Sequence, residues 1–473
     1  MKKNLLMFIP LVAMATLVGC NNSNSGLKPK KGDVIYESRL VYDLSDETDR
    51  TVSVKIGKDK AVSKIQCGRV STEDKKYMGG SKGILTISSE FMKQVPAGEK
   101  DIVVTYNDKS VETVDAFVAT KVLKTAEDFQ GIQNNPNGTY ILGNDIDCSS
   151  IANFEPIGVY YTETDTRNAY FHGILDGNGY KVSNINCSYS EGRVGTSDSG
   201  YPSNYDVYTE TTNAQNGFEE LCHKAGDNVG IFQVIGSSGV IRNLTFDNCY
   251  VHGRTIVGVI AGNNMGLVEN CLVTQSCRVL MDTHFWDDDC NCGAAFGIVA
   301  GSGVVNNVVS LATNVQVRGT YEDYSDEYIG NPGTGYDHGG NTQNNFWRFW
   351  GANKVDGNSA VYTDSNGKNT NGCYSFAGKC WGEINNSVAA SFNVSPYGQD
   401  VRAVCFSQYH VGDNKPDSGA TDLGTITNCD VYSQSDLKLA ATYSSFDNDV
   451  WNIVEGSFPS INQPVIKSTI YGE

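Results

Sequence analysis

The densest group of side chains able to bind a ligand is aromatic and falls within one Gly-, Asn- and Asp-rich stretch, residues 320–372. Aromatic rings pack on the apolar faces of sugars, and the neighbouring amides and carboxylates bond to hydroxyl groups. We therefore predict a glycan-binding or surface-binding site, with the alternative that these rings pack a loop onto the body of the protein. The candidate residues are Tyr336, Phe346, Trp347, Phe349 and Trp350, together with Trp286 in an earlier insertion.

Three consecutive carboxylates, Asp287, Asp288 and Asp289, form the second candidate site. Calcium takes about six to eight oxygen ligands, so the run is a candidate for calcium binding. It lacks the spaced ligands of an EF-hand, and a solvated acidic loop is the simpler interpretation. Paired carboxylates also serve polysaccharide hydrolases, in which one of the two acids has a raised pKa. No other cofactor is implied.

A β-helical polysaccharide hydrolase or lyase is the alternative to a binding protein. Asp337-His338-Gly339 resembles part of a pectin-hydrolase site, but the chain lacks the Arg-x-Lys sequence expected beside it. Residues 126–473 carry the entire acidic excess of the chain, whose formal net charge is −18. A lyase of acidic glycans needs a basic cleft instead. The same negative charge repels phosphate backbones, so we exclude nucleic acid as a partner.

The first residues are typical of an export signal. Lys2 and Lys3 precede an apolar run over residues 5–18, which is shorter than the roughly 20 residues of a membrane-spanning helix. The run ends in Leu17-Val18-Gly19-Cys20, which resembles the lipobox of bacterial lipoproteins. The resemblance implies that residues 1–19 are removed and that Cys20 carries acyl chains such as palmitate, which would hold the protein on a bacterial membrane, outside the cytoplasm.

Residues 20–32 are polar and predict a flexible tether. Residues 33–121 are rich in short runs of Val, Ile, Tyr and Thr separated by turns, which predicts a β-sandwich. This segment resembles the immunoglobulin-like modules of surface lipoproteins, and we expect it to act as a spacer. Thr125 and Asp128 have the spacing of a capping box, which predicts a short helix that covers the open end of the next domain.

A short motif, Val or Ile followed by any residue and then Asn, recurs six times between residues 182 and 428. In five copies a glycine lies four positions before the Asn, whereas the first copy has its glycine at Gly179. We expect the glycine to supply a positive φ in a tight turn and the Asn to bond at a corner. The pattern predicts short parallel strands that stack into one core, with the Asn side chains in a ladder. The Asn positions are Asn184, Asn243, Asn270, Asn307, Asn386 and Asn428.

The segments 178–184, 229–232 and 257–262 resemble the GLUG-type repeats of bacterial surface proteins, and the resemblance extends over residues 122–465. Similar repeats occur in the β-helical part of the immunoglobulin-A-cleaving zinc metallopeptidases. Peptidase activity needs His-Glu-x-x-His, and none of the six histidines begins that motif. The resemblance implies an all-β chain without peptidase activity. Its domains would be an immunoglobulin-like β-sandwich over residues 33–121 and a right-handed parallel β-helix with long loop insertions over residues 122–473.

The 14 cysteines divide into two groups. Cys249, Cys271 and Cys429 fall in strand patterns, where we expect small buried apolar side chains. The others of interest fall in segments that we interpret as loops, and they are the better disulfide candidates: Cys222, Cys290, Cys292, Cys373 and Cys380.

Taken together, these features predict a membrane-anchored extracytoplasmic protein that binds rather than catalyses. Loops on the β-helix would recognise a glycan or a protein of a host or neighbouring cell, as in adhesion. A purely structural surface protein is a further alternative.

Overall fold

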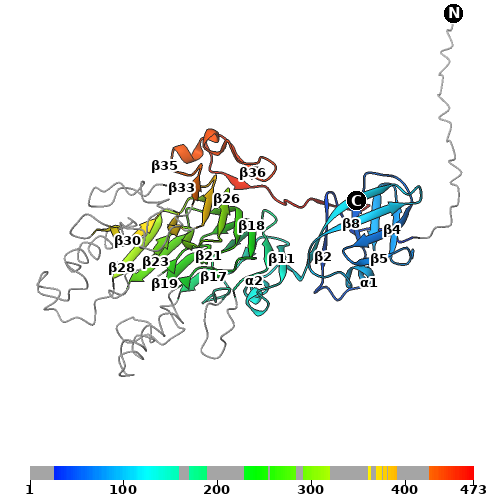
Figure 1. Ribbon diagram of the computed structural model, residues 1–473, viewed down its shortest axis with the longest axis horizontal. Coiled ribbons are helices and arrows are strands. Elements are labelled where there is room, and N and C mark those ends of the chain that lie inside the picture. The colour runs from blue at the N-terminus through cyan, green and yellow to red at the C-terminus, as the bar shows by residue number, and fades with distance from the viewer. Residues whose placement is uncertain are drawn as a thin grey trace, which may run out of the picture.

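The computed structural model describes residues 26–158, 170–188, 228–253, 256–283, 291–319, 361–363, 369–374, 376–380, 382–390 and 425–472. Within these ranges the chain is built from strands and turns, with only short helices (Figure 1). The prediction of an all-β protein is confirmed. Parallel strands dominate residues 121–432, as the repeats led us to expect.

The first part of the chain forms two sheets that enclose one apolar core. The first sheet contains, in order, β38 (Ser468–Ile470), β1 (Val34–Tyr36), β3 (Val52–Lys55), β7 (Ile84–Ile87) and β6 (Met78–Ser81). The second contains β2 (Arg39–Asp43), β9 (Val111–Ala119), β8 (Gly98–Tyr106), β4 (Val62–Cys67) and β5 (Val70–Thr72). Val54 and Leu85 of the first sheet share a buried cluster with Leu40, Ile65 and Ile102 of the second.

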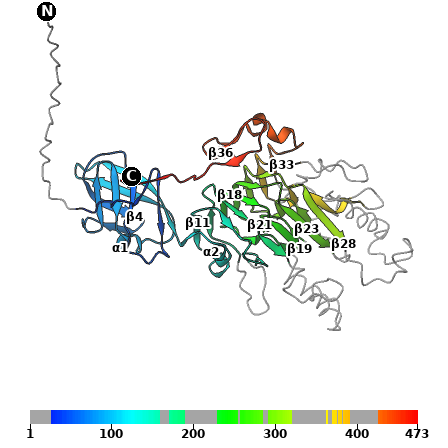
Figure 2. The same cartoon turned by 180° about the vertical axis from the view of Figure 1, so that it is seen from behind.

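The edge strand of the first sheet comes from the far end of the sequence. β38 pairs antiparallel with β1, so that Val34 lies opposite Ile470. Both views show the end of the chain returning to the first part of the molecule (Figures 1 and 2). The range 122–473 that the sequence predicts as one domain therefore includes a strand that completes the sheet of another.

The junction between the two parts is a capped helix, α2 (Ala126–Gln130). The Thr125 hydroxyl accepts a hydrogen bond from Asp128 N at 3.1 Å, and the Asp128 carboxylate accepts one from Thr125 N at 3.2 Å. Phe129 is fully buried in the core of the parallel region. The predicted capping box is therefore confirmed, and its helix packs on the beginning of that core.

The parallel region, residues 121–432, contains strands that stack on one another in four series. The longest contains β10 (Lys121–Leu123), β11 (Thr139–Leu142), β13 (Ile174–Asp176), β18 (Val240–Asp247), β22 (Leu267–Val273), β26 (Val304–Asn306), β32 (Glu383–Asn385) and β34 (Thr425–Thr427). Beside this series run β12 (Ile146–Asp147) with β14 (Lys181–Ser183), and β27 (Val309–Ser310), β33 (Val388–Ala390) and β35 (Asp430–Tyr432).

The other three series are shorter but follow the same rule. One contains β15 (Asn186–Ser188), β19 (Tyr250–Gly253), β23 (Arg278–Thr283) and β28 (Asn314–Gly319). The next contains β17 (Phe232–Ile235), β21 (Ala261–Asn264), β25 (Phe296–Val299) and β31 (Ala377–Cys380). The last contains β16 (Asn228–Val229), β20 (Ile256–Val257), β24 (Asn291–Gly293) and β30 (Asn369–Tyr374), with β29 (Val361–Thr363) antiparallel to β30.

The apolar residue of the repeat motif occupies the same place in five successive strands. Ile241, Val268, Val305, Ile384 and Ile426 are register partners in a single row. The first four of these side chains are fully buried. Stacking of the motif, which the sequence predicts, is confirmed for these copies.

The first copy of the motif lies outside that row. Val182 is the register partner of Ile146 and Phe246, and Asn184 bonds to Asn248 rather than to the Asn of another copy. A different position in the stack explains why this copy departs from the glycine spacing of the other five.

The Asn residues turn the chain at the corners, and they do so with positive φ. Asn243, Asn270 and Asn307 have φ of 53°, 50° and 52°. Asn270 Nδ2 donates to Asn243 Oδ1 at 3.4 Å, and Asn307 Nδ2 donates to Asn270 Oδ1 at 3.4 Å. The predicted ladder is confirmed between these coils.

The glycines before the Asn act differently from the prediction. The left-handed backbone belongs to the Asn, and glycine is needed because successive turns stack closely. A Cβ on Gly266 would lie 2.4 Å from Gly239 O, and one on Gly382 would lie 2.2 Å from Gly303 O. The expectation that the glycines supply a positive φ is therefore wrong for Gly239, Gly266, Gly303 and Gly382, whereas Gly179 of the first copy has a φ of 80°, as expected.

The cysteines that were interpreted as loop residues are partly in strands. Cys292 lies in β24 and Cys380 in β31, and both are buried in the core of the parallel region. Burial raises the pKa of the Cys380 thiol to about 12, so this thiol stays protonated. Cys249 and Cys271 are buried in the same core, as predicted, whereas Cys429 lies between β34 and β35 and is only partly buried against that core.

The C-terminal segment, residues 433–467, covers one outer flank of the parallel region. Its apolar side chains Leu437, Phe446 and Trp451 pack against Leu272 and Val309 of that flank. Trp451 lies in β36 (Trp451–Asn452), which pairs antiparallel with β37 (Ser460–Ile461). The flank therefore has an apolar core of its own outside the stacked strands.

Candidate binding groove

A groove of about 730 Å³ lies between the outer flank of the parallel region and the C-terminal segment. Its lining residues come from separate parts of the sequence, namely Asp145, residues 179–181, residues 245–276, Leu311 and residues 452–463. Because these stretches are distant in sequence, only the completed fold brings their side chains together. The lining combines carboxylates, hydroxyls, amides and one ammonium group with a few apolar side chains.

The alternation of two paired strands places the charged groups in the groove. β14 and β18 pair in parallel, with Val182 opposite Phe246, and both of these side chains are fully buried. Side chains on a strand alternate between its faces. Lys181 and Asp247 therefore point outward, where Lys181 Nζ lies 3.0 Å from Asp247 Oδ2. These side chains are 42% and 28% exposed.

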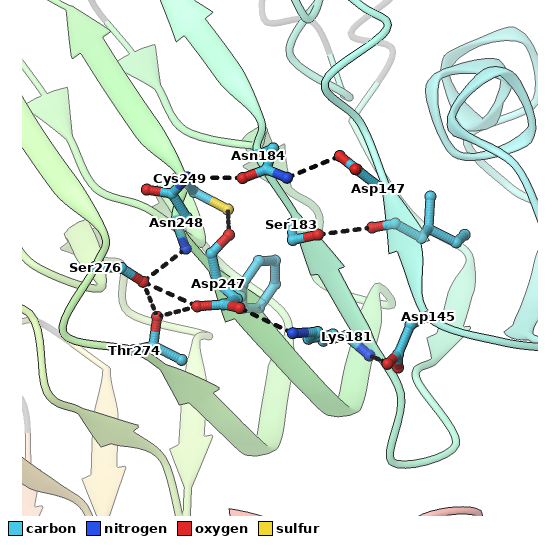
Figure 3. Close-up of polar contacts among 12 residues, drawn as sticks. Asp145, Asp147, Lys181, Ser183, Asn184, Asp247, Asn248, Cys249, Thr274 and Ser276 are labelled. Carbon is cyan, nitrogen blue, oxygen red and sulfur yellow. Dashed lines mark hydrogen bonds and ion pairs between the residues drawn. The ribbon is translucent and has the colours of Figure 1, made fainter.

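Two hydroxyl groups complete the surroundings of Asp247. Thr274 and Ser276, in the turn after β22, donate to Asp247 Oδ1 at 2.9 and 2.8 Å (Figure 3). Burial opposes ionisation of this carboxyl, but the bonds from Lys181, Ser276 and Thr274 outweigh it and lower its pKa. Asp247 is therefore ionised at neutral pH. It is unsuited to the role of general acid, which requires a raised pKa.

Asp145 links the parallel region to the C-terminal segment. Its Oδ1 atom accepts a hydrogen bond from Lys181 N at 3.1 Å and another from Gln463 Nε2 at 2.9 Å. The exposed Asp145 carboxylate thus stands beside Lys181 at one end of the groove (Figure 3).

The wall formed by the C-terminal segment is fixed at Asn178 and Gly179. Val465 N donates to Asn178 O at 3.0 Å, and Ile466 N donates to Asn178 Oδ1 at 2.5 Å. A Cβ on Gly179 would lie only 1.8 Å from Asn462 O, so no other residue fits without displacing the wall. The glycine that breaks the repeat spacing is therefore required by the groove.

A second polar chain runs behind the ion pair. Asn248 Nδ2 donates to Asn184 Oδ1 at 2.7 Å, and Asn184 Nδ2 donates to Asp147 Oδ1 at 2.8 Å (Figure 3). The bond from Asn184 is the main reason why the pKa of Asp147 is lowered. Asn248 N also donates to Ser276 Oγ at 2.9 Å, which joins this chain to the surroundings of Asp247.

The sequence analysis did not identify this groove. Lys181, Asp247 and Thr274 belong to three different coils, and nothing in their local spacing marks them as neighbours. The signal that the sequence offered was the apolar character of Val182 and Phe246. Once these two residues pair inside the core, their sequence neighbours Lys181 and Asp247 must lie on the outer face.

The residues that the sequence singled out lie outside the described ranges. This applies to the lipidation site Cys20, to Trp286 and to the carboxylates Asp287, Asp288 and Asp289. It applies equally to Tyr336, Phe346, Trp347, Phe349 and Trp350. Glycan, calcium and lipid binding at these positions stay predictions.

The part of the chain that the structure describes shows neither a metal-binding cluster nor a membrane-spanning helix. There, no group of three or more His, Cys, Asp or Glu side chains is arranged to hold a metal ion. No helix in the same ranges has the length and apolar character needed to cross a membrane.

Comparison with known proteins gives a partial similarity. No family model matches the chain. Halomucin of Haloquadratum walsbyi is 28% identical over 158 residues, which make up 31% of this chain and 1% of halomucin. The matched stretch is thus a very small part of that protein, and the GLUG-type resemblance stays a prediction.

Proposed function

We propose that this chain is a lipid-anchored extracytoplasmic protein that recognises a glycan or a surface protein without catalysing a reaction. In this proposal Cys20 carries the anchor, residues 33–121 form an immunoglobulin-like spacer and the parallel region is a right-handed β-helix. The loops inserted into the β-helix and the groove on its flank are the surfaces available for recognition.

The order in which strands visit the four series supports the β-helix. β17, β18, β19 and β20 follow one another in sequence, and β21, β22, β23 and β24 then stack on them in the same order. A chain that repeats this circuit winds as a coil around one core, and parallel crossovers of this kind are right-handed in nearly all proteins. The buried residues of all four series form one cluster, which agrees with a single coil.

The two sheets of the first part support the spacer role. They enclose a core of their own, and their first strand, β1, begins just after residues 20–32, the predicted tether. Glu99 on β8 accepts from Arg242 on β18 at 2.6 Å and lies 3.3 Å from Arg39 on β2. Such ion pairs would hold the β-helix in a defined orientation on the spacer.

The observation that favours binding over catalysis is the lowered pKa of the Asp247 carboxyl, which keeps it ionised. The carboxylate in the groove is paired with Lys181 and two hydroxyls, and its pKa is lowered rather than raised. Glycoside hydrolysis needs an acid that holds its proton near neutral pH. Asp247 therefore offers the groove a hydrogen-bonding group in a fixed position rather than a proton donor.

A glycan array tests the proposed function. The chain from residue 21 onward is applied beside a Trp347→Ala/Trp350→Ala double variant, whose thermal unfolding is measured as a control. We expect saturable binding, weakened by about tenfold or more in the double variant if the aromatic insertion is the site.

If the array shows no binding, capture of a protein partner from cell and matrix surfaces is the next experiment. Failure of both experiments would contradict recognition and favour the alternative of a purely structural protein. Release of sugar from any glycan of the array would contradict the absence of catalysis.

A further inference from the structure

We infer that the groove beside the C-terminal segment is a binding site for a neutral, hydroxyl-rich saccharide. The inference rests on the proposed function of extracytoplasmic recognition and assigns it a second site, separate from the aromatic insertion. All of the residues that line the groove belong to the described ranges.

The groove has the dimensions and rigidity of a ligand site. Its volume of about 730 Å³ falls within the roughly 300–1,000 Å³ typical of small-molecule sites. One wall is the paired strands β14 and β18, and the other is fixed by the bonds to Asn178 and by the packing of Asn462 on Gly179. A site formed before the ligand arrives loses little conformational entropy on binding.

The unused hydrogen-bonding capacity in the groove matches hydroxyl groups. An ammonium group has three N–H donors, and Lys181 uses one of them for Asp247. Asp145 accepts its two hydrogen bonds through Oδ1, and its Oδ2 atom has no further bond among the described residues. A hydroxyl group both donates and accepts, so two vicinal hydroxyls can bond to Asp145 and Lys181 together.

The charge of the groove selects against acidic ligands. Two carboxylates, Asp145 and Asp247, face one ammonium group, Lys181. An added carboxylate or sulfate would meet a net negative charge in the groove. A sugar without such groups avoids this repulsion and keeps all of the hydrogen bonds.

Apolar side chains line the same groove. Phe458 is half-buried there, beside Leu311 and Pro459. Sugar rings present C–H groups on one face and hydroxyls at their edges, so a mixed lining of this kind suits them better than it suits a small inorganic ion. Size, bonding capacity, charge and apolar surface therefore indicate the same class of ligand.

A blocking variant with a matched control tests the site. Thr245 lies half-buried on β18 in the groove, whereas Thr427 lies exposed on β34 away from it. Thr245→Tyr fills the groove, and Thr427→Tyr makes the same change on another strand of the parallel region. Binding of neutral glucose, galactose and mannose oligosaccharides is measured for both by calorimetry, with the corresponding uronic acid oligosaccharides as competitors.

We expect Thr245→Tyr to weaken binding of the neutral oligosaccharides by about tenfold or more, while Thr427→Tyr changes it by less than about twofold. Asp145→Asn, which removes one negative charge, should reduce the discrimination against uronic acids. Equal binding by Thr245→Tyr and the unmodified protein would overturn the inference, as would a preference of the unmodified protein for uronic acids.

The outcomes separate this inference from the proposed function. Binding that is lost in Trp347→Ala/Trp350→Ala and kept in Thr245→Tyr supports recognition but places it in the insertion, so the inference fails alone. Binding lost in Thr245→Tyr and kept in the double tryptophan variant supports the groove. Absence of binding to every saccharide contradicts the inference. The proposed function then depends on recognition of a surface protein.

Discussion

A single amide side chain, Asn270, joins three parts of the molecule. It donates to Asn243 in the preceding coil at 3.4 Å, and its Oδ1 atom accepts from Asn307 in the next coil and from Trp451 Nε1 in the C-terminal segment, both at 3.4 Å. Its φ of 50° places it in the left-handed region, which Asn tolerates better than other residues with a side chain. Position 270 therefore requires both an amide side chain, for these hydrogen bonds, and a residue that tolerates a positive φ.

Replacing Asn270 by Ala and by Gly separates these two constraints. Both variants lose the ladder bonds and leave the amide of Asn307 and the indole of Trp451 without this acceptor, which costs about 1–3 kcal/mol. Only Ala also adds the backbone penalty of a positive φ, about 1 kcal/mol more. Urea unfolding should rank the free energies of unfolding as unmodified, Asn270→Gly, then Asn270→Ala. Equal stability of the two variants would contradict a conformational role.

The sequence predicted the residues of the Asn ladder because the motif repeats along the chain. It did not predict the pair of Lys181 and Asp247, because these residues meet through strand pairing between coils. It also assigned the wrong reason to the glycines of the later copies, Gly239, Gly266, Gly303 and Gly382. A positive φ and a close backbone approach both favour glycine, so a sequence does not distinguish them.

The structure of the C-terminal segment, residues 433–467, is the one that was hardest to predict from the sequence. Its short strands β36 and β37 carry no repeat, and its apolar residues pack on a flank rather than inside a coil. The all-β class and the parallel stacking, by contrast, follow from a repeated pattern and are confirmed. The finer assignments, a right-handed β-helix and an immunoglobulin-like sandwich, stay proposals.

A methyl group at Gly179 should loosen this segment from the parallel region. Gly179→Ala places a Cβ against Asn462 O at a glycine with φ of 80°. Gly456→Ala is a matched control, because Gly456 has φ of 83° and no atom within 4 Å of the added Cβ. Backbone strain of about 1 kcal/mol is common to both, so the difference between them measures the clash.

We expect faster hydrogen exchange over residues 451–463 in Gly179→Ala than in Gly456→Ala, and weaker binding in the groove. Identical exchange in the two variants would show that the wall does not depend on this close approach.

At the scale of the whole molecule, the two parts are joined in several places. Ile466 packs in one cluster with Val41 and Phe117 of the first part and Ile141 of the parallel region. Glu99 and Arg242 add an ion pair across the same junction. The orientation of the groove relative to the two sheets of the first part is thus fixed by apolar and charged contacts together.

The proposed anchor is tested on the intact chain expressed in a bacterium. Cys20→Ala removes the sulfur that the lipobox resemblance assigns to acylation, so incorporation of labelled palmitate should be lost and the protein should leave the membrane fraction. Cys222→Ala serves as a control for removal of an unrelated cysteine. Retention of label in Cys20→Ala would contradict the lipoprotein assignment.

The pairing of β38 with β1 has a consequence for biosynthesis. A chain is made from its N-terminus, so β1 is finished hundreds of residues before β38. Throughout that interval the first sheet has an open edge, and open edges invite pairing with other chains. A chain that stopped before residue 468 would keep the edge of β1 exposed, whereas β38 covers it. The first sheet can therefore reach its full set of strands only after residues 468–470 have been made.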